Sequence, residues 1–108
     1  MARTLPQPTT DSIDLSTVLA ALADPVRLEI ARTLRRQTEP VNCSGVAEAS
    51  GVEVSAPTIS HHWKVLRDSG VTSTEVVGRT RIIQLRTEDL EERFPGLLAA
   101  ILDAPARP

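Results

Sequence analysis

One stretch of the sequence concentrates side chains that form hydrogen bonds or carry positive charge. These side chains are Thr58, Ser60, His61, Lys64 and Arg67. No acidic residue interrupts them before Asp68. Cationic, hydroxyl and imidazole groups are the ones that hold phosphates and read the edges of bases. The stretch therefore predicts contact with a polyanion, and with nucleic acid in particular.

The adjacent histidines His61 and His62 offer a second kind of chemistry, because imidazole is a common metal ligand. Successive residues of a helix point about 100° apart, so the two rings cannot chelate one ion together. We therefore assign His61 to a phosphate or base contact. We assign His62 to packing or hydrogen bonding between helices.

The same stretch has the features of one capped helix over residues 55–69. Its apolar residues recur at helical spacing and form a stripe that faces a core. They are Ile59, Trp63 and Leu66, with Val65 beside them. We place Trp63 in that core rather than at a small-molecule pocket. Ser55 can cap the helix, Pro57 fits its first turn, and Gly70 can adopt the left-handed conformation that ends it.

Length and composition indicate one cytoplasmic domain. The chain has 108 residues, of which 41% are hydrophobic and 2% aromatic, so aliphatic side chains must fill a single core. No apolar run approaches the roughly 20 residues that span a bilayer, and the N-terminus lacks an apolar signal core. The single cysteine, Cys43, cannot form an internal disulfide, which fits a reducing compartment. We expect no membrane association.

The formal net charge of −2 argues at first against a nucleic-acid partner, but the charge is unevenly distributed. Residues 58–86 hold five cationic side chains against two acidic ones, whereas residues 87–108 hold two against five. Interactions between exposed charges are screened over roughly 8–10 Å, so local charge decides what a surface binds. An acidic total is therefore compatible with a basic face.

The chain before this helix predicts three further helices. Residues 1–10 show no periodicity and are expected to form a flexible tail. A first, very apolar helix is expected from Asp11 or Ser12, and a second one begins at Asp24-Pro25. Asn42 or Ser44 caps a short third helix that ends at Ser50-Gly51. Because four residues separate this helix from the next, the pair is a helix-turn-helix by arrangement.

The chain after Gly70 predicts a hairpin and a helical end. Residues 71–77 and 80–85 are rich in β-branched residues and flank Gly78-Arg79, so they form a two-stranded wing. A helical turn follows at Thr87, and a short apolar helix follows Phe94-Pro95-Gly96. The fold class is mainly α with a small β-hairpin: four helices, the hairpin and a helical end. The domain covers residues 11–103, and residues 104–108 form a C-terminal tail.

Three segments resemble the ArsR/SmtB family of bacterial winged-helix repressors over roughly residues 12–103. They are Leu22-Ala-Asp-Pro-Val-Arg-Leu-Glu-Ile30, Thr58-Ile-Ser-His-His-Trp-Lys-Val-Leu-Arg-Asp-Ser-Gly70 and the hairpin with Gly78-Arg79. The resemblance implies a homodimeric transcriptional repressor that binds a palindromic operator on double-stranded DNA, through recognition helix 55–69 and wing 71–85, until an effector arrives. No effector is named by the sequence.

The resemblance also implies which residues do the binding. The expected DNA contacts are Ser55, Thr58, Ser60, His61, Lys64, Arg67, Arg79 and Arg81. The dimer is expected to pair through the terminal helices, whose apolar residues lack an evident cover. These residues are Leu15, Val18, Leu19, Leu22, Leu97, Leu98, Ile101 and Leu102.

The chain departs from the metal-sensing members of that family. They place Cys-x-Cys at the start of the third helix, where this chain has Asn42-Cys43-Ser44, and no histidine follows His62. We therefore expect no metal and no cofactor. No arrangement typical of an enzyme stands out. Two alternatives remain: a redox- or metal-responsive repressor that uses Cys43, and a winged-helix module that binds protein without binding DNA.

Overall fold

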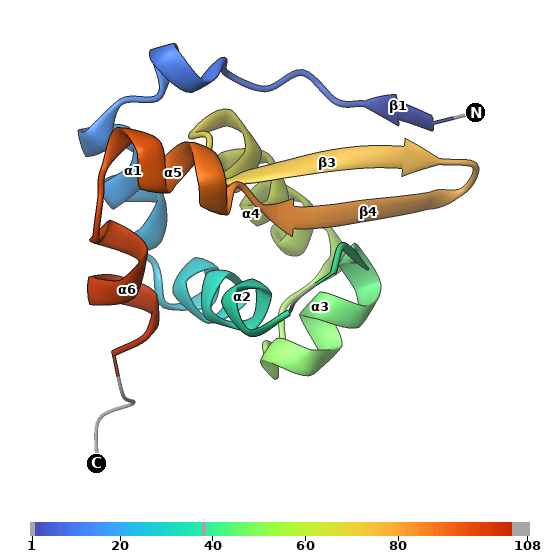
Figure 1. Ribbon diagram of the computed structural model, residues 1–108. Coiled ribbons are helices and arrows are strands. Elements are labelled where there is room, and N and C mark those ends of the chain that lie inside the picture. The colour runs from blue at the N-terminus through green and yellow to red at the C-terminus, as the bar shows by residue number, and fades with distance from the viewer. Residues whose placement is uncertain (1, 38, 105–108) are drawn as a thin grey trace.

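The computed structural model describes residues 2–37 and 39–104. Its helices are α1 (Leu15–Leu22), α2 (Pro25–Arg36), α3 (Cys43–Ser50), α4 (Ala56–Asp68), α5 (Thr87–Arg93) and α6 (Leu97–Leu102). Its strands are β1 (Ala2–Thr4), β2 (Val41–Asn42), β3 (Thr72–Val77) and β4 (Thr80–Leu85). The β3–β4 hairpin extends beyond the helices as a wing, with α4 behind it (Figure 1). The predicted mainly helical fold with a β-hairpin is confirmed.

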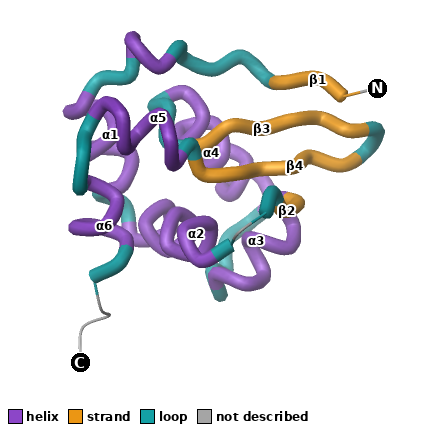
Figure 2. The backbone as a smooth tube through the Cα atoms, in the orientation of Figure 1, coloured by secondary structure: helices purple, strands orange, loops and turns teal. Residues whose placement is uncertain are grey.

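The sheet contains more than the predicted hairpin. Its strands lie in the order β1-β3-β4-β2, and each neighbouring pair is antiparallel. In the hairpin, Thr72 pairs with Leu85 at the base and Val77 with Thr80 at the tip. The two short outer strands come from the N-terminus and from the segment before α3 (Figure 2). The wing is therefore flanked on both edges.

Helices α2 and α3 begin where the local sequence predicts. The Asp24 carboxylate accepts a hydrogen bond from Arg27 N at 3.0 Å, and Pro25 begins α2. Asn42 caps α3 through Gly45 N at 2.8 Å, so of the two predicted caps Asn42 is the one used. These caps satisfy backbone N–H groups that have no partner inside the helix.

The start of α1 differs from the prediction. Thr10–Ser12 form a single 3-10 turn, and α1 itself begins at Leu15 with Asp14 as its cap. Between them Ile13 is extended, with ψ 124°, and 1% exposed. Burying this side chain in the core holds the backbone out of the helix for that residue.

The predicted flexible tail over residues 1–10 is at odds with strand β1. Ala2–Thr4 pair with β3, and Leu5 N donates to Thr74 O at 2.9 Å. A three-residue strand is not stable alone, so it forms only because β3 presents an open edge. At the other end, residues 105–108 of the predicted C-terminal tail lie outside the described residues.

The core lies where the helices meet the base of the wing. Its fully buried side chains include Ile30, Leu66, Ile83, Leu90 and Leu98. Trp63 is half-buried against this core, as predicted from its place on the apolar stripe. The stripe of α4 is thus fixed by packing, and its opposite face is left at the surface.

Candidate nucleic-acid interface

Helix α4 presents most of its predicted contact residues to solvent. Ser55, Thr58, Ser60, His61 and Lys64 are exposed, whereas His62 and Leu66 on the other side are buried. The first turn is fixed by Ser55, whose Oγ accepts from Thr58 N at 3.3 Å and donates to Thr58 Oγ1 at 2.9 Å. A rigid N-terminal turn with exposed hydroxyl groups is suited to close contact with another molecule.

The C-terminus of α4 sets the direction of the wing. Gly70 has φ 88°, its N–H donates to Arg67 O, and Val71 N donates to Leu66 O, each at 3.1 Å. This pattern is a Schellman motif, which requires a left-handed residue at the glycine position. Val71 is fully buried and leads directly into β3. The wing therefore leaves the helix at a fixed angle.

Two cations of α4 have surroundings that the sequence did not reveal. Lys64 forms an ion pair with Asp68 one turn later, in which both side chains are largely exposed. Arg67 is half-buried, and its Nε is buried with no hydrogen-bond partner among the described residues. The DNA contact of Arg67 stays a prediction, and its side chain is less exposed than that of Lys64.

The wing brings its two cations close to the start of α3. Arg79 lies in the turn and Arg81 on β4, and both are exposed. Together with Thr80 they line one side of a hollow of about 310 Å³. Asn42, Cys43 and Ser44 line the other side. The cations of the wing therefore lie beside the first residues of the helix-turn-helix.

His62 ties α4 to the start of α2. Arg27 donates from Nη1 to His62 Nδ1 at 3.1 Å and from Nε to Ala21 O at 2.7 Å. Because guanidinium can only donate, Nδ1 carries a lone pair and the imidazole is neutral. Burial lowers the pKa of His62, as do the charges of Arg27 and His61, while Asp24 opposes them. The predicted inter-helix role of His62 is confirmed.

The sequence of this chain is similar to those of known proteins, and these similarities indicate the function of the arrangement. Residues 22–75 match the helix-turn-helix domain family. The chain is 33% identical over 84 residues to the uncharacterized HTH-type transcriptional regulator YceK of Bacillus subtilis, covering 78% of this chain and 82% of that protein. It is 36% identical over 81 residues to the arsenical resistance operon repressor of Staphylococcus xylosus, covering 72% and 71% respectively. The chain belongs to the ArsR/SmtB family.

A solved structure supports the same assignment. The crystal structure of an ArsR family transcriptional regulator superposes with a TM-score of 0.64 at 26% identity, covering 84% of this chain and 98% of that one. As a member of this family, the protein is a DNA-binding transcriptional regulator and not an enzyme. Among the described residues, no helix has the length and apolar character needed to cross a membrane.

The position at which metal-sensing ArsR/SmtB proteins carry thiolates is different here. Cys43 is half-buried between Asn42 and Ser44. Burial raises the pKa of its thiol, although the nearby charges of Arg81 and Arg67 partly oppose this. Among the residues that the structure describes, no three His, Cys, Asp or Glu side chains gather into a group able to hold a metal ion.

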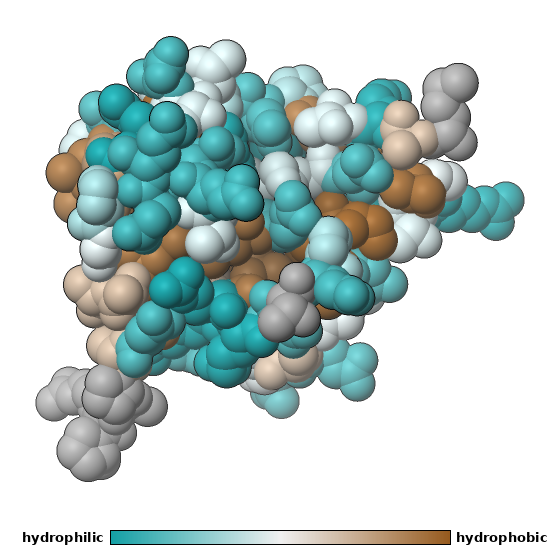
Figure 3. Space-filling view, viewed as in Figure 1, coloured by the Kyte–Doolittle hydropathy of each residue, from teal (hydrophilic) through white to brown (hydrophobic). Residues whose placement is uncertain are grey.

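The predicted dimer residues divide into two sets. Val18, Leu22, Leu98 and Leu102 are at most 5% exposed within one chain, so they belong to its own core and cannot pack on a second copy. This corrects the prediction, because α1 and α6 cover these side chains within the chain. Leu15 and Leu19 remain 43% and 42% exposed. Leu97 and Ile101 remain half-buried. Figure 3 shows hydrophobic side chains at the end where α1, α5 and α6 lie.

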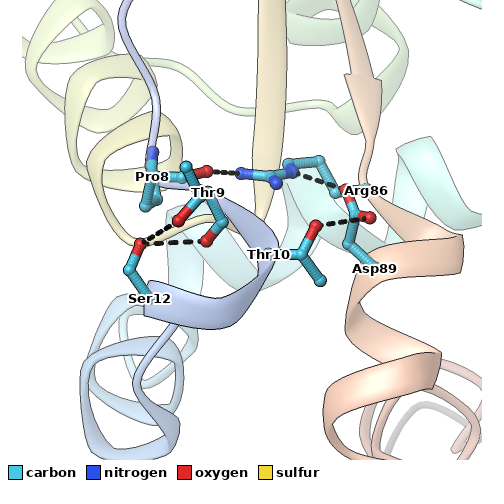
Figure 4. A network of polar contacts seen from close by, with 6 residues as sticks. All are labelled: Pro8, Thr9, Thr10, Ser12, Arg86 and Asp89. Carbon is cyan, nitrogen blue, oxygen red and sulfur yellow. Dashed lines mark hydrogen bonds and ion pairs between the residues drawn. The ribbon is translucent and has the colours of Figure 1, made fainter.

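Sequence reasoning missed a polar network that holds the N-terminal segment (Figure 4). Arg86 is 7% exposed and donates from Nη1 to Pro8 O at 2.7 Å and from Nε to Asp89 at 3.0 Å. Thr10 Oγ1 donates to the same carboxylate at 2.9 Å. The Thr10 and Arg86 hydrogen bonds hold the pKa of Asp89 below its ordinary value. Thr10 and Asp89 are 79 positions apart and Pro8 and Arg86 are 78 apart, so no local pattern predicts these two contacts.

Proposed function

We propose that the protein is a homodimeric repressor that binds a palindromic operator through α4 and the β3–β4 wing. The observation that carries this proposal is the exposed polar face of α4, together with the exposed wing cations Arg79 and Arg81, which lie beside the start of α3, the first helix of the helix-turn-helix. Two such helices in a dimer would enter successive major grooves about 34 Å apart. The repressor of the arsenical resistance operon among the relatives supports the direction of regulation.

The contact residues fall into two roles under this proposal. Ser60 and His61 project from the middle of α4 and would read base edges. Lys64, Arg79 and Arg81 would hold phosphates, which fixes the position of the helix without reading sequence. Ser55 and Thr58 form the cap of α4, and they would contact the DNA backbone at this N-terminal turn.

The dimer would form through the apolar side chains that one chain leaves uncovered. Leu15 and Leu19 are one turn apart on α1 and are both substantially exposed, and Leu97 and Ile101 are partly exposed on α6. Exposed leucines one turn apart form a continuous stripe on a helix. Burying such a stripe against a second copy is favoured by about 25 cal/mol per Å² of apolar area.

The DNA-binding test is a gel-shift titration against fragments of the protein's own promoter region. Arg79→Ala is expected to weaken binding to all sequences and to lower the salt slope by about 1, since one phosphate contact is lost. Ser60→Ala is expected to weaken binding at one base position only. Arg36→Ala removes an exposed cation from the far end of α2 and is the matched control. Equal binding by all three variants and the wild type contradicts these contacts.

The ion pair of Lys64 provides a sharper test. Asp68 competes with a phosphate for the Lys64 ammonium group. Asp68→Asn is therefore expected to strengthen operator binding, and Lys64→Ala to weaken it. If neither Asp68→Asn nor Lys64→Ala changes operator binding, the pair lies away from the DNA.

Sedimentation tests the dimer separately. Leu19→Glu places a charge in the proposed interface and is expected to give a monomer with reduced operator affinity. Val54→Glu, at a similarly exposed apolar residue before α4, is the control and should leave the oligomeric state unchanged. A wild-type protein that sediments as a monomer at micromolar concentration overturns the proposed dimer.

The same experiments address the remaining alternatives. A dimer that ignores every promoter fragment at low salt favours a winged-helix module for protein association. An effector that releases the protein from its operator would show in the same gel-shift assay. We place the protein in the cytoplasm, where a bacterial operator lies.

A further inference from the structure

The N-terminal segment enlarges the wing. Strand β1 adds to the free edge of β3, with Arg3 opposite Val76 and Thr4 opposite Glu75. Figure 1 shows β1 running alongside β3, on the side away from β4. The wing is thus three strands wide along its outer half, where the sequence predicts two.

The register of these strands decides which way Arg3 faces. Directly paired residues in a sheet point to the same side. Val76 pairs with both Arg3 and Arg81, so the three side chains share one face. Strands lie about 4.8 Å apart, which puts Arg3 and Arg81 on lines roughly 10 Å apart. Both arginines are exposed.

This face is the one proposed to meet DNA. Arg81 lines the hollow against the start of α3, which places the face on the side of the helix-turn-helix. The acidic residue of the wing, Glu75, alternates to the opposite face with Ser73 and Val77. Arg3 and Arg81 therefore lie on the face of the sheet toward the helix-turn-helix, and the Glu75 carboxylate lies on the opposite face.

The segment that carries Arg3 is held at its base. Leu5 N donates to Thr74 O at 2.9 Å, and the Arg86–Asp89–Thr10 network secures residues 8–10. Because Arg86 is almost fully buried, these hydrogen bonds are shielded from water. Arg3 is consequently presented by an anchored strand.

We propose that Arg3 is a DNA-phosphate contact, presented by β1 as a third cation of the wing beside Arg79 and Arg81. The proposal rests on the proposed function and extends it to a segment outside the family match at residues 22–75. A cation held on a docked strand loses little conformational freedom on binding, so its contact is stronger than that of the same residue on a free arm.

The test measures operator affinity of the full chain against salt concentration. Arg3→Ala is expected to weaken binding to cognate and unrelated DNA alike and to lower the salt slope by about 1. Arg3→Lys should retain the slope, and Arg36→Ala serves as the control for charge alone. An Arg3→Ala protein that matches Arg36→Ala in slope and affinity overturns the proposal.

A second variant tests the docked strand. Leu5→Pro removes the N–H that bonds to Thr74 O, and it lies outside the cationic set. It is expected to weaken binding as Arg3→Ala does, and the double variant should be no weaker than Arg3→Ala. If Leu5→Pro retains wild-type affinity, docking of β1 does not support the contact, and the proposal fails.

The two proposals fail in different ways in this assay. If Arg3→Ala leaves operator affinity unchanged while Arg79→Ala and Ser60→Ala still weaken it, only the role of Arg3 is overturned. A wild-type chain that binds no promoter fragment overturns the proposed function and this inference together.

Discussion

Arg27 and His62 join the first turn of α2 to the middle of α4 through a contact of 3.1 Å between Nη1 and Nδ1. The residue is 7% exposed, and its imidazole accepts this hydrogen bond only while Nδ1 is unprotonated. The helix that carries the proposed base contacts is therefore positioned by a histidine that must remain neutral.

This relationship predicts a pH dependence of stability. The pKa of His62 is below its ordinary value of 6.5 in the folded chain, chiefly because of burial. Below about pH 6.5 the unfolded chain takes up a proton that the folded chain does not, so stability is lost as the pH falls. The free energy of unfolding should decline between pH 7.5 and 5.5. One proton contributes at most about 1.4 kcal/mol per pH unit to this slope.

Urea unfolding followed by Trp63 fluorescence measures this slope. His62→Gln is expected to flatten it, because the titrating group is gone, while lowering stability at pH 7.5. His61→Gln, which changes the exposed neighbour, should retain the wild-type slope. The groups that act on the ring are Asp24, Arg27 and His61. The His62→Gln variant leaves all three of them unchanged. Identical slopes for His62→Gln and the wild type contradict the prediction.

The glycines that end α3 and α4 are expected to lose different amounts of stability when each is replaced by alanine. Gly51 and Gly70 both have positive φ, 73° and 88°. An added Cβ would meet nothing within 4 Å at Gly51, but at Gly70 it would lie 2.7 Å from Ile13 Cγ1. Gly51→Ala should cost about 1–2 kcal/mol for left-handed strain alone. Gly70→Ala should cost clearly more, because Ile13 is buried and cannot move away freely. Urea midpoints measure both losses, and equal losses would mean that Ile13 repacks without cost.

The parts of the fold that are encoded locally could be predicted from the sequence. Asp24, Asn42 and Ser55 each accept a hydrogen bond from a backbone N–H three residues later, so the cap and its partner lie in one short segment. The same is true of Gly70, whose left-handed conformation ends the helix that it follows. The exposed face of α4 follows from these ends and from its apolar stripe.

The rest depends on contacts between distant segments. Strand β1 exists because β3 has a free edge, and the buried Arg86 donates to the Pro8 carbonyl of the same N-terminal segment. The prediction of the dimer residues was wrong in part for the same reason. A helix that is apolar on several sides does not reveal which sides its own chain covers, and the structure places Val18 and Leu22 inside.

The environment of Cys43 predicts that its thiol reacts slowly with alkylating reagents. Burial raises its pKa above the ordinary value of 9.0, so little thiolate is present near neutral pH. Alkylation by iodoacetamide at pH 7.5 is expected to be at least about tenfold slower in the folded chain than in urea. Promoter binding by Cys43→Ser and by the wild type should respond equally to peroxide. Rapid alkylation of the folded chain, or peroxide release that Cys43→Ser abolishes, would support the redox alternative.

The base of the wing contains a buried hydroxyl group that we expect to lower stability. Thr72 is 0% exposed, and its Oγ1 has no hydrogen-bond partner among the described residues. Burying an unpaired hydroxyl costs about 1–3 kcal/mol. Thr72→Val keeps the shape and the β-branched side chain while removing that cost. It is expected to raise the free energy of unfolding by about 1 kcal/mol. Thr80→Val, at an exposed position on β4, should change it little. A loss of stability in Thr72→Val would show that the hydroxyl is satisfied, for example by a bound water.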